Sequence, residues 1–454
     1  MGIFLEIALF SLLKKLWCGK KSDPPAKQTE TTAVAQTGTP APAPTRSAFL
    51  CREAVFDRRN RLAGHLFRLQ QSTAQADAND IRQHQFDQIL LDTLNASPAA
   101  WNTSLAFIPL NSKSLELAAV DRLKTTNLVL LVHLANDADP AQLTARLEVL
   151  RQRGLIIGIF RQPKNPAFTE AILLADFGVV DIGGCEASNI RDFSAAFRAS
   201  ETDYPNALFG CNIDTLDEHH LCHQWDFDYF HGRFAAATLQ RPDDNSVDPH
   251  KMQLLHLLRL VQGEADTAEI ARAMKQDPLL AFRILRYLNS PALGLSHHID
   301  SLDQALIIIG RQRLMRWLSV LLFSVREPGF GDWLMVESAL TRGRLMEILG
   351  TGLNPGQPAD PFFLTGIFSC LDRLLRRPLS EILKDLPLSE TVRVALLEHR
   401  GPYAPLLAVA EASDAFDLPR MESTALAAGV DPDAVNRALL AATAWASEVT
   451  EDWD

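Results

Sequence analysis

The sequence has 454 residues, of which 47% are hydrophobic and 22% charged, as expected for a soluble protein of two or three domains. The net charge is −11, from 44 Lys and Arg against 55 Asp and Glu, so we expect no nucleic acid as a partner. The six cysteines show no C-x-x-C spacing, which argues against a zinc ribbon or a disulfide framework and favours a cytoplasmic setting.

Residues 1–21 combine an apolar run, Ile3 to Leu13, with lysines that follow it. The run is shorter than the roughly 20 residues that a membrane-spanning helix needs, and its charge order is the reverse of a secretory signal. The pattern predicts an amphipathic helix that lies on the inner membrane surface, with a helix packed on the protein's own surface as the alternative. The expected location is therefore cytoplasmic, with peripheral attachment to the inner membrane if the first interpretation holds.

Residues 22–47 change in composition to Pro, Ala, Thr and Gln, including a Thr-Pro-Ala-Pro-Ala-Pro stretch at 39–44. Such a segment has too little apolar surface to offset the entropy of ordering. The composition predicts a disordered linker between the first helix and the folded part of the chain.

In residues 48–241, short apolar runs alternate with amphipathic stretches. This alternation predicts a parallel sheet, closed or open, flanked by helices. The expected strands are 105–110, 128–134, 155–160, 178–182, 207–213 and 229–230. The expected helices include 80–95, 140–153 and 168–175.

The run Ala54-Val55-Phe56-Asp57, followed by Gly64, resembles the first β-hairpin of EAL domains, the barrel family of cyclic-di-GMP phosphodiesterases. Further matches follow in the family's order at Phe107-Ile108, Ala175-Asp176-Phe177 and Asp228–Gly232. The resemblance implies a degenerate, shortened TIM-like (β/α) barrel.

The EAL family holds two metal ions with carboxylates and an Asn at the carboxyl ends of the barrel strands. The resemblance aligns the family's metal-binding and substrate-binding positions with residues that mostly carry other side chains, although Asp181 keeps a carboxylate. The aligned residues are Leu66, Gln70, Pro109, Phe160, Arg161, Val179, Cys211 and His231. Two hard cations need several oxygen ligands. We therefore expect no catalytic residues, no bound metal, no cofactor and no enzymatic activity.

Two sets of residues in this region are candidates for binding despite the missing ligands. Arg68 and Arg161 are basic residues near the motif positions and are candidate contacts for a phosphate, with solvated surface residues as the alternative. His219, Cys222 and His223 have ligand types and a spacing that suit zinc, with an ordinary helix on the outside of the barrel as the alternative.

Residues 242–454 show helical patterns throughout. Asp266 precedes an expected helix over 267–275, and Ser301 begins a capping box for an expected helix over 302–309. The pattern predicts an all-α domain after the α/β domain.

The motifs Gln276–Leu279, Leu285–Ser290 and Ile299–Ala305 follow one another in an order that resembles the HDOD domain. HDOD domains are helical relatives of metal-dependent HD phosphohydrolases, whose chemistry needs a His-Asp dipeptide. None of the twelve histidines is followed by Asp. The resemblance therefore implies a helical bundle that binds proteins.

Together the two resemblances identify the chain as similar to EAL–HDOD signalling proteins. We expect a non-catalytic signal-transduction adaptor that binds other signalling proteins through a degenerate EAL domain (48–241) and an HDOD domain (242–454), without cyclic-di-GMP as a ligand. Two alternatives stay open. One is a receptor that binds cyclic-di-GMP without hydrolysis, and the other is a residual metal-dependent cyclic-dinucleotide phosphodiesterase.

Overall fold

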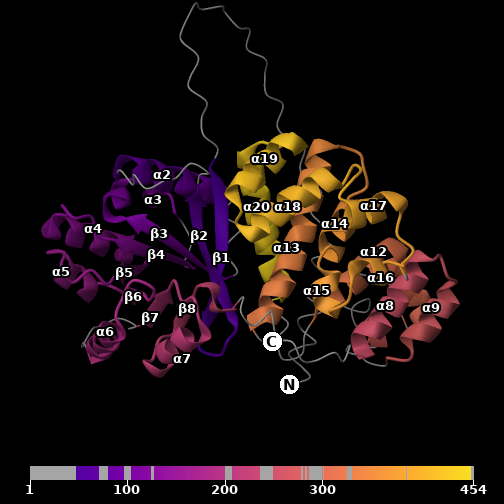
Figure 1. The fold of residues 1–454 in the computed structure, drawn as a ribbon, viewed down its shortest axis with the longest axis horizontal. Coiled ribbons are helices and arrows are strands. Elements are labelled where there is room, and N and C mark those ends of the chain that lie inside the picture. The colour runs from indigo at the N-terminus through magenta and orange to yellow at the C-terminus, as the bar shows by residue number, and fades with distance from the viewer. Residues whose placement is uncertain are drawn as a thin grey trace, which may run out of the picture.

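The structure is a computed structural model, and it shows a barrel beside a helical bundle (Figure 1). It describes residues 48–70, 80–96, 104–123, 127–199, 207–235, 249–277, 280–281, 284–285, 299, 301–324, 330–384 and 386–450. The predicted N-terminal helix (1–21) and linker (22–47) lie outside the described residues. No helix among the described residues is both long and apolar enough to cross a bilayer.

Eight strands close into a barrel in sequence order, which confirms the predicted sheet and shows that it is closed. The first two strands form an antiparallel hairpin, the following neighbours are parallel, and the last strand closes antiparallel on the first. The strands are β1 (Phe49–Asp57), β2 (Leu62–Gln70), β3 (Leu105–Asn111), β4 (Leu128–His133), β5 (Ile156–Phe160), β6 (Phe177–Asp181), β7 (Ala207–Cys211) and β8 (Tyr229–His231).

Helices cover most of the outside of the barrel. They are α2 (Asp80–Ala96), the 3-10 helix η2 (Ser112–Glu116), α3 (Ala118–Asp121), α4 (Pro140–Gln152), α5 (Phe168–Leu173), α6 (Ala187–Ala199) and α7 (Leu216–Gln224). Local sequence sets their starts: the Asp139 side chain accepts a hydrogen bond from the Ala141 N–H, and Pro140 occupies the first turn. The bounds of α2, α4 and α5 agree with the predicted helices to within two residues.

The barrel interior is filled by alternate residues of the strands. Large side chains such as Phe107, Phe177 and Phe209 pack there with Val129 and Leu131. The centre of the barrel is thus a solid core, so a ligand can approach only at the rim.

The second half of the chain is a helical bundle, as predicted. Its helices are α8 (Pro249–Gln262), α9 (Thr267–Met274), α11 (Leu302–Ile309), α12 (Arg311–Leu321), α13 (Phe330–Leu353), α14 (Asp360–Phe368), α15 (Leu371–Leu375), α16 (Leu379–Ile382), α17 (Glu390–Glu398), α18 (Ala404–Ala415), α19 (Leu418–Ala428) and α20 (Pro432–Thr450). The predicted cap at Ser301 is present, because its side chain accepts a hydrogen bond from the Gln304 N–H.

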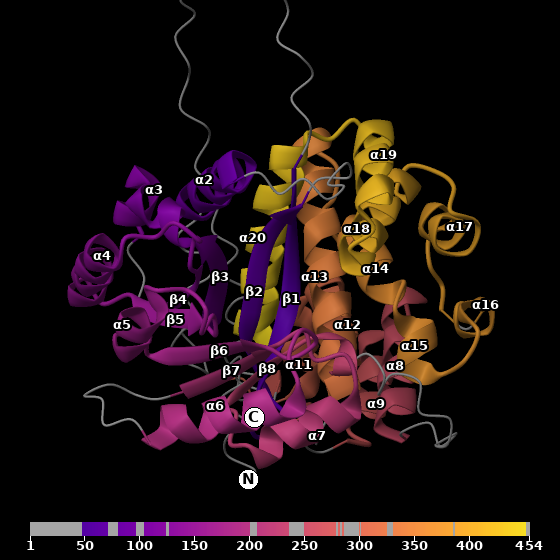
Figure 2. The ribbon, with the colours of Figure 1, turned by 60° about the vertical axis from the view of Figure 1, so that its left-hand side comes forward.

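The β1–β2 hairpin joins the two halves of the molecule. Figure 2 shows this hairpin lying along α13 and α20 of the bundle. The Leu50 N–H donates to Asn436 Oδ1 over 2.8 Å, and Asn436 Nδ2 donates to the Ala48 carbonyl over 3.0 Å. The connection from β1 to β2 is a tight turn without a helix, and α13 and α20 cover the outer face that a barrel helix would otherwise cover.

Candidate functional site at the barrel rim

Three polar side chains meet inside the rim of the barrel. Glu53 on β1, Arg68 on β2 and His231 at the end of β8 occupy positions whose alternation points them to the barrel interior. Arg68 donates to Glu53 Oε1 over 2.5 Å, and His231 Nε2 lies 2.5 Å from Glu53 Oε2. Burial raises the pKa of Glu53, but the hydrogen bonds and charges of His231 and Arg68 outweigh burial and bring it below the ordinary value. The carboxylate is therefore ionised at neutral pH.

Two loops that follow β7 and β8 hold His231 in place. The Ile213 N–H donates to the His231 carbonyl over 3.1 Å, and the Phe234 N–H donates to the Ile213 carbonyl over 3.1 Å. Gly232 lies between these contacts with φ +146°, and a Cβ there would come within 2.2 Å of the Ile213 carbonyl oxygen. Only glycine fits this close backbone crossing.

A buried ion network lies on the outer side of the same hairpin. Glu337 of α13 forms an ion pair with Arg52 of β1 and accepts a hydrogen bond from His65 Nε2 of β2 over 2.6 Å. Asp414 of α18 lies 3.7 Å from Arg52 and 2.8 Å from Arg342. Burial and the charge of Arg52 lower the pKa of His65 to about 3, so this imidazole is neutral and donates its Nε2 proton to Glu337.

A cleft of about 750 Å³ opens where the barrel rim meets the bundle. The barrel lines it with residues of β1, β2 and the loops after β7 and β8, including the cluster around Glu53. The bundle lines it with residues of α13, with Arg373 of α15 and with the end of α18 near Phe416. Its volume lies in the range of small-molecule sites.

The two arginines predicted as phosphate contacts lie in different places. Arg68 lines the cleft and bonds to Glu53, with 41% of its side chain exposed. Arg161 follows β5 and is not among the residues that line the cleft; its guanidinium lies 6.0 Å from the centroid of the Phe193 ring and 4.0 Å from the sulfur of Cys185. The structure therefore does not bring Arg68 and Arg161 into one site.

The three predicted metal-binding candidates lie on α7, outside the barrel. His219 is buried in an aromatic cluster, where its ring stacks on Phe234 at 4.7 Å and meets Phe330 of α13 at 5.1 Å. Burial lowers the pKa of His219 to about 4. Cys222 is fully buried, and burial raises its pKa to about 12. The His223 ring is centred 6.3 Å from that of His219. Hydrophobic contacts at the domain junction account for the burial of His219 and Cys222.

The residues at the rim do not fit the two metal ions that the resemblance implies. Among the described residues, no group of three or more His, Cys, Asp or Glu side chains is placed to hold a metal ion. The Glu53 carboxylate at the rim is engaged by Arg68 and His231. No reaction step through a metal is therefore derived from this site.

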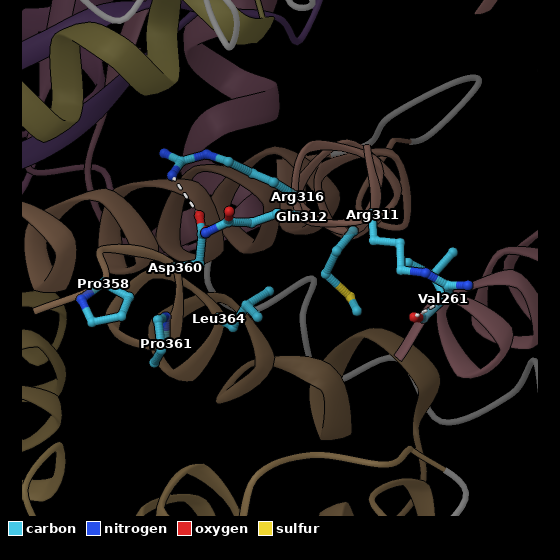
Figure 3. A pocket seen from close by; sticks show the side chains of 9 residues that line it. Val261, Arg311, Gln312, Arg316, Pro358, Asp360, Pro361 and Leu364 are labelled. Carbon is cyan, nitrogen blue, oxygen red and sulfur yellow. Dashed lines mark hydrogen bonds and ion pairs between the residues drawn. The ribbon is translucent and has the colours of Figure 1, made fainter. Parts of the chain in front are cut away.

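A second cavity, of about 340 Å³, lies within the bundle between α8, α12 and α14 (Figure 3). Arg316 and Asp360 pair at 3.4 Å on one side of it, and Arg311 donates to the Val261 carbonyl on the other. Arg316 also pairs with Glu347 at 2.6 Å. These charges are satisfied within the bundle, so this cavity resembles a packing gap more than a binding site.

Sequence reasoning named Arg68 and His231 but missed Glu53, which joins them, and it missed the Glu337 network. A signal for the first was present: Glu53 and Arg68 are charged residues at inward-facing positions of two paired strands, where apolar residues are the norm. No signal in the sequence pairs Glu337 with His65, because their contact spans 272 positions and depends on how two domains pack.

A family model matches part of the bundle. Residues 249–376 match the HDOD domain. The chain is 25% identical over 307 residues to cyclic di-GMP phosphodiesterase CdgJ of Vibrio cholerae, covering 67% of this chain and 69% of the relative. It is 29% identical over 198 residues to uncharacterized protein YuxH of Bacillus subtilis, covering 43% of this chain and 48% of that protein, or about half of its length.

Solved structures with some similarity include proteins with EAL domains. The Bacillus subtilis YkuI protein, in complex with substrate c-di-GMP and calcium, aligns with a TM-score of 0.34 and 14% identity, covering 58% of this chain and 73% of that chain. The PaMucR phosphodiesterase in a c-di-GMP complex aligns with a TM-score of 0.34 and 13% identity, covering 43% of this chain and 92% of that chain.

The comparison with CdgJ corrects one prediction. A relative that matches two thirds of the chain is named a phosphodiesterase. The expectation that the chain is not an enzyme is therefore wrong. The expectation considered only the metal-ligand positions of one family and the missing His-Asp dipeptide. It did not foresee that a carboxylate, an imidazole and a guanidinium gather at the rim.

Proposed function

We propose that this chain is an EAL–HDOD signalling protein that works in cyclic-di-GMP signalling by binding other signalling proteins, with barrel and bundle acting as one unit. The relation to CdgJ supports the pathway. One observation supports the proposal that barrel and bundle act as a single unit. It is the buried network in which Glu337 of the bundle contacts both Arg52 and His65 of the barrel.

The network supports this function for an electrostatic reason. Arg52, His65 and Glu337 are each less than a tenth exposed, so a substitution that removes one of them in either half leaves its partner in the other half buried without a counterpart. Removing one partner of a buried ion pair typically costs about 3–5 kcal/mol. A change at one half is therefore felt at the other, as signal transfer requires.

The bundle offers exposed apolar side chains to a protein partner. Leu426 on α19 is 84% exposed and Ile307 on α11 is 72% exposed, more than any other large hydrophobic side chain of the described residues. The fully buried core of a protein interface is more apolar than the rest of a protein surface. This exposure supports the bundle as the partner-binding half.

Photo-crosslinking in the native host tests the proposal. A photoreactive phenylalanine replaces Leu426 or Ile307 in the full chain, and the same residue at Leu173, 54% exposed on barrel helix α5, is the control. We expect protein adducts from the two bundle positions and few from Leu173. Mass spectrometry of the adducts identifies the partners. The absence of adducts at both bundle positions would contradict partner binding through these side chains.

A second candidate function, hydrolysis of cyclic-di-GMP, is favoured by the name of the Vibrio cholerae relative. The purified chain is incubated with the dinucleotide in Mg²⁺ or Mn²⁺ buffer, and chromatography detects the linear product. If the rim supports this reaction, His231→Gln lowers the rate at least tenfold, whereas His220→Gln at an exposed position of α7 leaves it unchanged. No product from the unsubstituted chain would remove this candidate.

A further inference from the structure

Helix α19 presents an apolar face around Leu426. This side chain is 84% exposed, and Ala427 next to it is also exposed. Pro419 is exposed two turns earlier, on the same side of the helix as Leu426. The face is therefore available for contact with another apolar segment.

Two carboxylates follow Leu426 in the turn from α19 to α20. Gly429 ends α19 with φ +67°, and Asp431 and Asp433 come after it, both exposed. Asp431 Oδ1 accepts a hydrogen bond from the Asp433 N–H over 2.7 Å, and among the described residues neither carboxylate forms an ion pair. Negative charge thus borders the apolar face, which suits a segment that combines apolar side chains with lysines.

The chain enters the barrel at this same end of the molecule. Asn436 of α20 bonds to Ala48 and Leu50, and Figure 2 shows α19 beside this end of α20. Ten residues of extended chain span about 36 Å at most, so Leu426 and Asn436, ten positions apart, lie closer together than that. A flexible chain as long as residues 22–47 has an r.m.s. end-to-end distance of about 25–30 Å. A segment attached through this linker can therefore reach the α19 face.

Residues 1–21 have the composition that suits this face. Their apolar run contains Phe4, Ile7 and Phe10 at helical spacing, and two lysines follow the run directly. The lysines complement the two carboxylates beside Leu426. Attachment through a flexible linker gives an effective concentration of about 1 mM, so a contact with a dissociation constant of about 1 mM is half formed within one chain.

From these features we propose that residues 1–21 dock on the α19 face around Leu426 and cover it until a protein partner displaces them. The contact is autoinhibitory, because it occupies one of the two side chains through which the bundle is proposed to bind partners. The inference rests on that proposed function and adds its regulation. Ile307 lies outside the contact, since Figure 2 shows α11 toward the opposite end of the molecule from α19.

Photo-crosslinking of the purified full chain tests the docking. A photoreactive phenylalanine replaces Leu426 in one variant and Ile307 in another, and mass spectrometry identifies the joined peptides. We expect the probe at position 426 to join residues 1–21 of the same molecule, and the probe at position 307 to join them at least fivefold less. Phe4→Asp together with Phe10→Asp is expected to reduce the crosslink from position 426 at least fivefold. Mixing isotope-labelled with unlabelled chains separates contacts within one molecule from contacts between two.

Three results would overturn the docking. The first is the absence of any crosslink between position 426 and residues 1–21, and the second is a crosslink found only between labelled and unlabelled chains. The third is cosedimentation of the full chain with phosphatidylglycerol vesicles when the chain alone gives no crosslink from position 426. That third result would assign residues 1–21 to a lipid surface instead.

Crosslinking in the native host tests the regulation. Phe4→Asp together with Phe10→Asp is expected to raise the protein adducts at position 426 at least threefold and to leave those at position 307 unchanged. Equal adducts at position 426 with and without these substitutions would overturn the autoinhibition. If partner adducts form at position 426 but residues 1–21 never join the probe, only the docking fails. If residues 1–21 join the probe but neither position gives a partner adduct, the proposed function fails instead.

Discussion

At the residue scale, the junction depends on a histidine that must stay neutral. Burial and the charge of Arg52 hold the pKa of His65 at about 3, whereas an unfolded histidine titrates near 6.5. Below pH 6.5 the unfolded chain therefore binds a proton that the folded chain does not. The free energy of unfolding then falls with decreasing pH, by about 1.4 kcal/mol per pH unit from this residue.

We expect His65→Gln to reduce this pH dependence between pH 6.5 and 5. Glutamine can still donate to Glu337 but does not titrate, so its folded and unfolded states bind the same number of protons. Urea unfolding at several pH values measures the slope, and His220→Gln, on an exposed histidine, is the control. Equal slopes for the unsubstituted chain and His65→Gln would show that His65 is not the titrating group.

A glycine at the rim provides a second test at this scale. Gly232→Ala adds a Cβ that would lie 2.2 Å from the Ile213 carbonyl oxygen, so the loops after β7 and β8 must separate. We expect a loss of at least about 2 kcal/mol in the free energy of unfolding. Gly154→Ala is the matched control, because Gly154 also has positive φ, +86°, but has no atoms within 4 Å of the added Cβ. Similar losses for both variants would attribute the effect to backbone conformation rather than to the crossing.

At the element scale, apolar periodicity predicted strands and helices well. The buried run 128–134 predicted β4, which spans Leu128–His133. A capping box at Ser301 predicted the start of α11, and the expected range 302–309 agrees with its observed bounds, Leu302–Ile309. These patterns are local: each depends on side chains within one element and on which face that element buries. The β1–β2 hairpin was anticipated by resemblance to a known family.

The candidate site could be predicted only in part, because the residues that line it are far apart in the sequence. Arg68 was singled out in the sequence and does lie at the cleft, but Arg161, chosen by the same argument, lies near Phe193 instead. The cleft forms between loops and helices that are far apart in sequence, and Arg373 reaches it only because α15 packs near the rim. His219 and Cys222 have zinc-like spacing, yet packing against the bundle buries them.

At the scale of the whole molecule, the bundle completes the barrel. The N-terminal end of α13 brings Phe330 and Trp333 into the aromatic cluster of Phe56, His219 and Phe234 on the barrel. Farther along α13, Glu337 enters the buried ion network, and α20 fixes the start of β1 through Asn436. Composition and motifs indicated two domains. That side chains of the two domains are buried against each other follows only from three-dimensional packing.

Scanning calorimetry of the full chain tests most directly whether barrel and bundle are one unit. The account predicts a single transition whose calorimetric and van't Hoff enthalpies agree. Trp333→Ala removes a ring that is only 5% exposed and should lower the stability of this single unit by about 3–5 kcal/mol, without splitting the transition. Two separate transitions in the unsubstituted chain, with Trp333→Ala shifting only one of them, would contradict the account.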